Sequence, residues 1–331
     1  MKTKQSQAAR IRRPSFFVTL FRRKKLGAFC MLYLLLMVLL AIFAGIISPY
    51  PMTNGMLPMD VLNALSNPSL SNGHLLGTDT LGRDVLSYLI YGARTSVILC
   101  LSCTVISTCI SVLLGTLSAV IGGWFDLLVQ RLVDAWSCIP SMLILLLLMS
   151  MLGQGMPQLV AAMALPAGIG GSRMVRSAAL TVKGSGYVRA SELLGGSILW
   201  KTVQHVVPNI FPLIITGMAS NLGGVIMMEA SLNFLGYGVD VGTPSWGYLI
   251  TNQGRANLFT APGLCMFPGI AIAAMVFASS MFGDAVRDIL DPRIQGGDAP
   301  SYEQKKTGRL FRKELKKYAE KIKDLEALRS A

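Results

Sequence analysis

The sequence has few charged residues for its length. Only 14% of its 331 residues are Asp, Glu, Lys or Arg, whereas 52% are hydrophobic, and soluble globular domains carry about 25% charged residues. Long uncharged runs account for the difference. Leu26 to Ile47 is a run of 22 residues without a charge, which is enough to cross a hydrocarbon core of about 30 Å as a helix. We therefore expect an all-α membrane protein.

Six membrane-spanning helices are predicted from these runs. They cover residues 26–47 and, more roughly, 96–121, 135–152, 157–172, 211–235 and 262–283. The fourth is short and rich in Gly and Pro. A cleaved signal peptide is the alternative for the first run, but the run is about twice as long as the usual apolar core of 7–15 residues and follows 25 mostly polar, basic residues.

Histidine is scarce, and several motifs of enzymes are missing. The chain has only His74 and His205, predicted on opposite sides of the membrane, and no HExxH sequence, so a membrane enzyme that depends on His is disfavoured. The dipeptide Gly-Lys does not occur, which excludes a phosphate-binding P-loop. The glycine-rich stretches 167–171 and 221–225 are instead typical of close helix packing. If ATP is used, another chain binds it.

The six cysteines all fall within predicted spans. Cys100 and Cys103 form a CxxC pair, which elsewhere indicates redox chemistry or zinc. There is no second pair and no nearby His, so small, weakly polar contacts between helices are the favoured interpretation.

The net charge of +13 is explained by topology. If the six spans start from a cytoplasmic N-terminus, 27 of the 30 Lys and Arg residues fall on the cytoplasmic side, and only Arg83, Arg94 and Arg255 fall outside. The positive-inside rule predicts such a distribution, so no nucleic-acid partner is needed. We expect a basic N-terminal segment at 1–25, a transmembrane domain at 26–293 and a basic tail at 294–331, with both termini cytoplasmic.

The two terminal segments each allow two interpretations. At the N-terminus, Phe16, Phe17, Leu20 and Phe21 could enter lipid from an amphipathic helix, or the segment could be a disordered basic leader. In the tail, apolar residues recur at helical spacing, so an amphipathic helix and a partly folded solvated tail both stay open. Those residues are Phe311, Leu315, Tyr318, Ile322 and Leu325.

Two polar groups outside the basic segments are candidate sites. His74, Asp79, Arg83 and Asp84 lie in the predicted external loop of about 48–93, where an ion pair and a helix cap are favoured over a metal site because the group has one His and includes an Arg. Glu229 is the clearest carboxylate at membrane depth. With Asn233 it is our candidate for the translocation pathway or a subunit contact, and an interfacial position near the helix end is the alternative.

The segment 186–209, "GYVRASELLGGSILWKTVQHVVPN", is too polar for lipid, yet it has the pattern of two short helices. Gly195-Gly196 allows a sharp bend between them. We expect Val188, Leu193 and Leu194 to lie near one another, and Pro208 to end the second helix. The apolar face of that helix would consist of Ile198, Leu199, Val203 and Val206. On the cytoplasmic side, such an element is a knob that fits a groove of another protein, or a packed cap.

This segment resembles the EAA motif of binding-protein-dependent ABC importer permeases, and its ending resembles the dipeptide/oligopeptide/nickel subfamily. The motif maps onto Arg189-Ala190-Ser191, Gly195, His205, Val207, Pro208 and Asn209. Further segments resemble that subfamily in the same order along the chain, so that the resemblance covers roughly residues 14–293. They are "LGTDTLGRDVLSYLIYGAR" (76–94), "EASLNFLGYG" (229–238), "TPSWG" (243–247) and "GDAVRDILDPR" (283–293).

The resemblance implies a type I importer permease fold with a cytoplasmic coupling loop at about 173–210. It implies a homologous second permease subunit, two ATP-binding cassette subunits that bind ATP and Mg, and an extracytoplasmic solute-binding protein as partners, besides membrane lipid. This chain would hold no cofactor and catalyse no reaction. It would lie in a bacterial or archaeal plasma membrane and pass short peptides, nickel or metal chelates. The alternative is a secondary transporter or channel, for which inverted repeats and several intramembrane ionisable residues are expected.

The docking residues that the resemblance implies are Arg189, Ala190, Ser191, Glu192, Gly195, His205 and Pro208. The sequence departs from the motif at two of them. Arg189 stands where the motif has Glu, and Ser191 stands where it has its second Ala, while a Glu follows at 192. The reversed charge indicates an altered groove on the partner, or an ion pair supplied by Glu192 instead.

Overall fold

The computed structural model describes residues 16–53, 55–70, 72–240 and 242–290. The regular secondary structure in these ranges is entirely helical. The ranges contain isolated β-bridges but no strand. The all-α prediction is confirmed for this part of the chain. The predicted amphipathic pattern of the tail, Phe311 to Leu325, lies outside the described residues.

The chain divides into a unit of Met1–Arg287 and a unit of Asp288–Ala331. All helices named here belong to the first unit, except that α12 (Gly263–Leu290) ends in the second. Within the described ranges, four helical segments are long and apolar enough to cross a membrane: α2 (Lys25–Ile42), α4 (Val85–Ile121), the run Ile198–Phe234 and α12. A bent pair, α5 and α6, brings the number to five if it counts as one span.

The predicted third span, 135–152, is wrong as a single straight helix. The structure has α5 (Gly123–Ser137) and α6 (Ser141–Leu152), bent by 89° at the break between them. Pro140 is the N-cap of α6 with extended backbone, φ −55° and ψ 127°, and the residue before a proline is also driven away from helical geometry. The predicted loop at 122–134 is therefore mostly helix.

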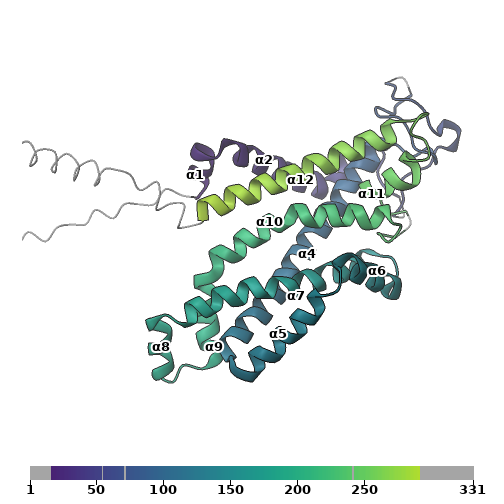
Figure 1. Ribbon diagram of the computed structural model, residues 1–331. Helices are drawn as coiled ribbons and strands as arrows, with labels where there is room; N and C mark the ends of the chain where they lie inside the picture. The colour runs from purple at the N-terminus through teal and green to yellow at the C-terminus, as the bar shows by residue number, and fades with distance from the viewer. Residues whose placement is uncertain (1–15, 54, 71, 241, 291–331) are drawn as a thin grey trace, which may run out of the picture. The chain divides into compact units, whose positions relative to one another are not determined.

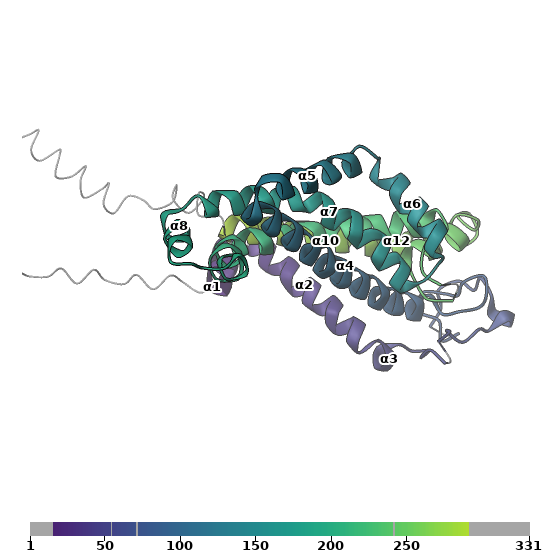
Figure 2. The same ribbon diagram turned by 90° about the horizontal axis from the view of Figure 1, so that it is seen from below.

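Helix α7 (Met156–Lys183) packs along α4, and glycines set the distance between the two. A Cβ atom on Gly168 would lie 2.7 Å from Cβ of Ile110, and one on Gly115 would lie 2.6 Å from the carbonyl oxygen of Ser172. The predicted role in close helix packing is confirmed for Gly168 and Gly171 of the stretch 167–171, but not for Gly170, where a Cβ would have no neighbour within 4 Å. Figure 2 shows α4 and α7 side by side along much of their length. The helix extends well beyond the predicted span 157–172.

The first span is shorter than its uncharged run. Helix α2 ends at Ile42, and a separate turn, α3 (Ala44–Ile47), follows Phe43. Before α2, residues Phe16–Arg23 form the helix α1. This favours the predicted helix over the disordered leader for these eight residues. Phe17 and Phe21 are exposed, but Leu20 is fully buried within the chain, so the expectation that Leu20 enters lipid is wrong.

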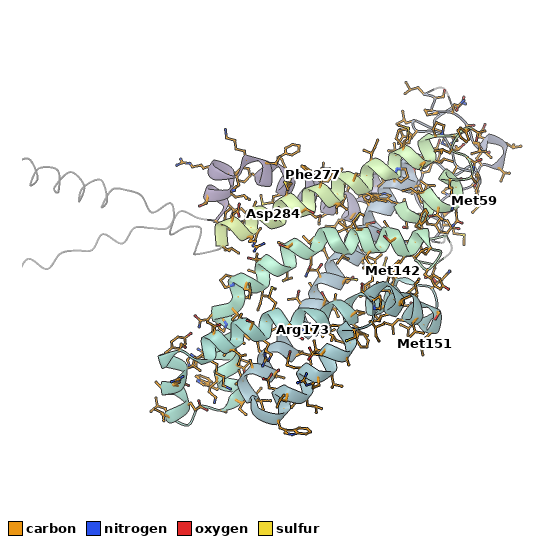
Figure 3. The ribbon with its side chains drawn as sticks, in the orientation of Figure 1. Met59, Met142, Met151, Arg173, Phe277 and Asp284 are labelled. Atoms are coloured by element: carbon orange, nitrogen blue, oxygen red, sulfur yellow. The ribbon has the colours of Figure 1, made fainter. Side chains whose placement is uncertain are left out.

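The segment between α3 and α4 is held by polar contacts. Asp84 caps α4 by accepting a hydrogen bond of 2.8 Å from the Ser87 N–H, and its other oxygen lies 3.0 Å from Nδ1 of His74. Asp79 pairs with Nε of Arg83 at 2.6 Å. The predicted ion pair and helix cap are confirmed. This segment, where Met59 is labelled in Figure 3, lies at one end of the first unit, and α8 and α9 lie at the other (Figure 1).

Candidate functional site

The segment 186–209 has the predicted helix–bend–helix. Helix α8 (Gly186–Leu193) is followed by a bend and by α9 (Ile198–Trp200). Gly195 has φ of +85°, a left-handed conformation that glycine adopts without steric cost. Its N–H donates a 3.0 Å bond to the carbonyl oxygen of Glu192, and Ser197 caps α9 by accepting from the Trp200 N–H at 3.2 Å.

Pro208 does not end the second helix, contrary to the sequence prediction. A π-helical turn, η2 (Lys201–Val206), joins α9 to α10 (Val207–Phe234), and the run Ile198–Phe234 is continuous. Pro208 lies in the first turn of α10, where a missing N–H and a fixed φ are tolerated. The second half of segment 186–209 is therefore continuous with the apolar run that ends at Phe234.

Three contacts make this segment a packed unit. Val188 and Val206 are buried, at 2% and 0% exposure. Nζ of Lys201 lies 3.0 Å from Oε1 of Glu192, and this hydrogen bond and the Lys201 charge lower the pKa of Glu192 below its ordinary value. The rings of Tyr187 and His205 meet edge to face, with centroids 6.0 Å apart. The ends of the segment cannot move independently while these contacts hold.

The apolar side chains of this segment divide into an inner and an outer set. Val188 and Val206 are buried, whereas the apolar residues with which the sequence interpretation grouped them are exposed. The grouping is therefore wrong for these two valines. We call the outer set the exposed apolar face. It consists of Leu193, Leu194, Ile198, Leu199, Trp200 and Val203, and Leu193 and Leu194 are 89% and 88% exposed. Figure 1 shows α8 and α9 protruding at the end of the first unit.

The predicted docking residues are close in sequence and differ in exposure. Arg189, Ala190, Glu192, Gly195 and Pro208 are exposed, and Ser191 and His205 are half-buried. Within the described part of the chain, the Arg189 guanidinium makes no hydrogen bond or ion pair that the geometry supports.

Sequence reasoning missed a polar network that fastens α7, the helix before segment 186–209, to α4 and α5. Asp126, near the start of α5, receives two hydrogen bonds from Arg176 of α7, 2.6 Å from Nε and 2.5 Å from Nη2. Lys183, at the end of α7, donates to the carbonyl oxygens of Ala119 and Val120 at 2.9 Å each, which satisfies the end of α4.

A second contact of the same kind joins α7 to α5. Nη2 of Arg173, labelled in Figure 3, lies 2.8 Å from Asp134 Oδ1. The basic residues that the sequence analysis counted only for topology therefore also fasten α7 to α4 and α5. The sequence feature that could have indicated these contacts is the presence of two acids, Asp126 and Asp134, between the second and third predicted spans.

Glu229 and Asn233 form a second cluster, enclosed within the chain. Both are 1% exposed. The Glu229 carboxylate accepts bonds from Ser96 of α4 at 3.1 Å, from Ser245 at 3.0 Å and from Asn233 at 2.8 Å. A carboxylate at membrane depth is costly unless it is paired or hydrogen-bonded, and here three donors from three parts of the chain meet that requirement.

The two cysteines of the CxxC pair lie in helix contacts, as predicted. Cys100 Sγ lies 3.4 Å from the carbonyl oxygen of Leu222 in α10, and Cys103 Sγ lies 3.8 Å from that of Val160 in α7. Both are buried and unoxidised.

A cavity of about 520 Å³ lies between α4, the α5–α6 bend, α7 and α10. Its described lining is uncharged, and Glu229 does not contribute to it. Apolar side chains such as Met163 and Val225 dominate, with polar groups from Ser107, Ser141 and Asn221. The volume is within the range of small-molecule sites.

Two family comparisons agree with this architecture. Residues 111–296 match the family described as "Binding-protein-dependent transport system inner membrane component". Residues 17–68 match "N-terminal TM domain of oligopeptide transport permease C". The chain belongs to the family of binding-protein-dependent transport system inner membrane components. It is a permease of an ATP-driven importer and resembles the dipeptide/oligopeptide subfamily.

Curated relatives cover most of the chain. The "Glutathione transport system permease protein GsiD" of Escherichia coli O6:K15:H31 (strain 536 / UPEC) is 33% identical over 276 residues, which is 83% of this chain and 89% of the relative. The proteins of the same name from Shigella boydii serotype 4 (strain Sb227) and Escherichia coli O157:H7 have the same identity and coverage. The importer interpretation is confirmed at the level of the family, and the comparisons give no support to a secondary transporter.

Proposed function

We propose that this permease forms half of the translocation pathway of an importer for short peptides, and that segment 186–209 docks onto an ATP-binding subunit. The family match carries the first part. The relatives are named for the transport of glutathione, a tripeptide, which supports a peptide substrate. A nickel or metal-chelate substrate is supported only by the subfamily resemblance.

Six spans are proposed for the membrane-embedded part. The four long apolar segments and the α5–α6 pair make five, and α7 is the sixth. Its 28 residues reach about 42 Å as a helix, more than the hydrocarbon core requires. Its charged residues Arg173, Arg176 and Lys183 gather toward one end. That end leads to α8, which supports a cytoplasmic position for the docking segment and for both termini.

The remaining partners follow from this arrangement. A homologous second permease would complete the pathway, and two ATP-binding subunits would bind ATP and Mg and hydrolyse ATP, so this chain would need no cofactor of its own. The solute-binding protein would deliver its load at the opposite end, where residues 48–84 lie. A bacterial or archaeal plasma membrane fits the family description, "inner membrane component".

The docking segment is suited to transmit motion. Its exposed apolar face offers contact area, and the Lys201–Glu192 pair and the Tyr187–His205 contact hold its shape. Closure of the ATP-binding subunits would move it, and the continuous run into α10 and the Arg176–Asp126 contact would carry that motion to the spans. Such coupling runs through elements with two discrete positions.

Glu229 and Asn233 are proposed to hold α4 against α10 beside the translocation pathway. Their enclosure by Ser96 and Ser245 supports a role in holding these helices together. The uncharged cavity is the better candidate for direct contact with substrate.

The test is affinity purification of this chain from native membranes, with mass spectrometry of the proteins that accompany it. We expect a homologous permease and one or two P-loop ATPases. Replacing 186–209 by a flexible linker of equal length should remove the ATPases and leave the second permease. Recovery of the chain without any ATPase would contradict the proposal.

A further inference from the structure

The basic side chains of segment 173–210 are almost all engaged within the chain. Four of the five have partners, and they are Arg173 with Asp134, Arg176 with Asp126, Lys183 with the end of α4, and Lys201 with Glu192. The fifth is Arg189, which is exposed on α8 and makes no ion pair among the described residues. It is the one cation of this segment that is left for another molecule.

Glu192 does not take this role for Arg189. It is the only acid between residues 173 and 210. Its Oε1 is held at 3.0 Å by Lys201, whose side chain is 9% exposed and has Glu192 as its ion-pair partner. Transferring Glu192 to Arg189 would leave the Lys201 ammonium buried and unpaired, which costs more than a surface ion pair returns.

The surroundings of Arg189 make an unpaired charge costly once the segment is docked. Leu193 ends the same helix, Leu194 is its C-cap residue and Leu199 lies on α9, all at least 70% exposed. A groove that covers these leucines removes water from their neighbourhood. A guanidinium that loses water there needs an acceptor from the groove.

We propose that the ATP-binding subunit presents an Asp or Glu carboxylate opposite Arg189, in a groove that is otherwise apolar. This inference rests on the docking proposed above and adds the chemistry of the partner surface. The guanidinium is planar and matches a carboxylate through two parallel hydrogen bonds, so the pair would also fix the angle at which α8 enters the groove.

A zero-length cross-link identifies the acid. In the Arg189→Lys variant of the complete importer, a water-soluble carbodiimide would activate the carboxylate. The new ε-amine would then attack it to form an amide, and the carbodiimide would leave as its urea. We expect one additional link, from position 189 to an Asp or Glu of the ATP-binding subunit, that is missing in the wild type. Formation of the Lys201–Glu192 link within this chain is the internal control.

The inference fails if the internal link forms, the ATP-binding subunit co-purifies, and no link from position 189 reaches it. Charge reversal gives an independent measurement. Arg189→Glu should reduce the co-purified ATP-binding subunit about ten-fold or more, because like charges would then face each other. Changing the identified acid to Arg should restore binding. Arg255→Glu, an equal charge change at an exposed site in the segment before α12, should leave it within two-fold.

Leu194→Asp separates this inference from the docking on which it rests. If Leu194→Asp removes the ATP-binding subunit and Arg189→Glu retains it within two-fold, docking stands and the acidic partner is wrong. If both variants retain the subunit, the docking proposal itself is wrong. Loss in both variants, with rescue of Arg189→Glu by the reversed partner, supports both.

Discussion

Asn233 Nδ2 donates a hydrogen bond of 2.8 Å to Oε1 of Glu229, one turn earlier on α10. The same oxygen accepts from Ser245, and the other accepts from Ser96 of α4. A carboxylate thus joins two helices and the segment before α11 (Trp246–Leu249) inside the chain. Each of the three donor side chains, from Ser96, Asn233 and Ser245, has the Glu229 carboxylate as an acceptor.

Removing this acceptor should destabilise the protein. Glu229→Leu leaves the hydroxyl donors of Ser96 and Ser245 without their acceptor, at about 1–3 kcal/mol for each group that stays buried and unpaired. Asn233 Nδ2 keeps its 3.0 Å bond to the main-chain carbonyl oxygen at position 229. Glu229→Gln keeps an acceptor oxygen and should cost less. Thermal unfolding in detergent, followed by size-exclusion chromatography, would rank them as wild type, Gln, Leu. Equal melting temperatures for the Gln and Leu variants would contradict the network.

The sequence allowed local features to be predicted where the deciding groups are close together. The bend at Gly195 and the cap at Asp84 each depend on residues within a few positions, and both are in the structure. The break at Pro140 was also within reach, because a proline usually excludes helix at the preceding residue. The uncharged run around Pro140, taken by its length alone, instead predicts one continuous span.

Pro208 and the α5–α7 contacts could not be predicted in this way. Whether a proline ends a helix or lies in its first turn depends on the turn before it, here the π-helical turn Lys201–Val206. Arg176 and Asp126 are 50 residues apart, and nothing in the local pattern names such a partner. The burial of Leu20 likewise depends on packing between helices, since α1 contacts α2 and Leu20 lies beside Gly27 of α2.

Two glycines of α7 offer a matched test of the α4–α7 contact. A Cβ on Gly168 would lie 2.7 Å from Ile110 Cβ, whereas one on Gly170 has no neighbour within 4 Å. Alanine favours a helix over glycine by about 1 kcal/mol at both sites. Gly170→Ala should therefore be neutral or slightly stabilising, and Gly168→Ala should lose about 1–3 kcal/mol through overpacking. Thermal unfolding of both variants checks this, and a higher melting temperature for Gly168→Ala than for wild type would refute it.

The Glu192–Lys201 pair predicts a pH dependence of the docking segment. Lys201 lowers the pKa of Glu192, so the stabilisation is present above the pKa of the unfolded state and is lost as the pH falls through the lower folded value. Because an ordinary Glu has a pKa of about 4.3, the pair should persist from neutral pH to about pH 5. It should weaken as the pH falls past about 4.3 and be lost below the lower pKa of the folded state.

Hydrogen exchange of residues 186–200 measures this directly, if each rate is divided by that of an unstructured peptide at the same pH. Wild type should be better protected than Glu192→Gln at pH 7 and at pH 5. The difference should shrink as the pH falls below about 4.3. A difference that disappears between pH 7 and pH 6 would contradict the assignment to Glu192.

Gly195 gives the sharpest test of coupling through the docking segment. Its φ of +85° is closed to proline, whose ring fixes φ near −65°, and proline would also lose the 3.0 Å hydrogen bond from Gly195 N–H to Glu192. Gly195→Pro should therefore change the angle between α8 and α9 without altering the membrane-spanning part. We expect normal amounts in the membrane, but loss of uptake and of substrate-stimulated ATP hydrolysis.

Gly186→Pro is the matched control for this substitution. Gly186 is the first residue of α8, where proline is favoured, and a Cβ there has no neighbour within 4 Å. The same change nine residues away should therefore leave uptake near the wild-type rate. If Gly195→Pro also supports normal uptake at normal ATP hydrolysis, then the bend does not transmit the motion of the ATP-binding subunits. The rigid connections of α7 to α4 and α5 would then be the remaining route by which that motion reaches the spans.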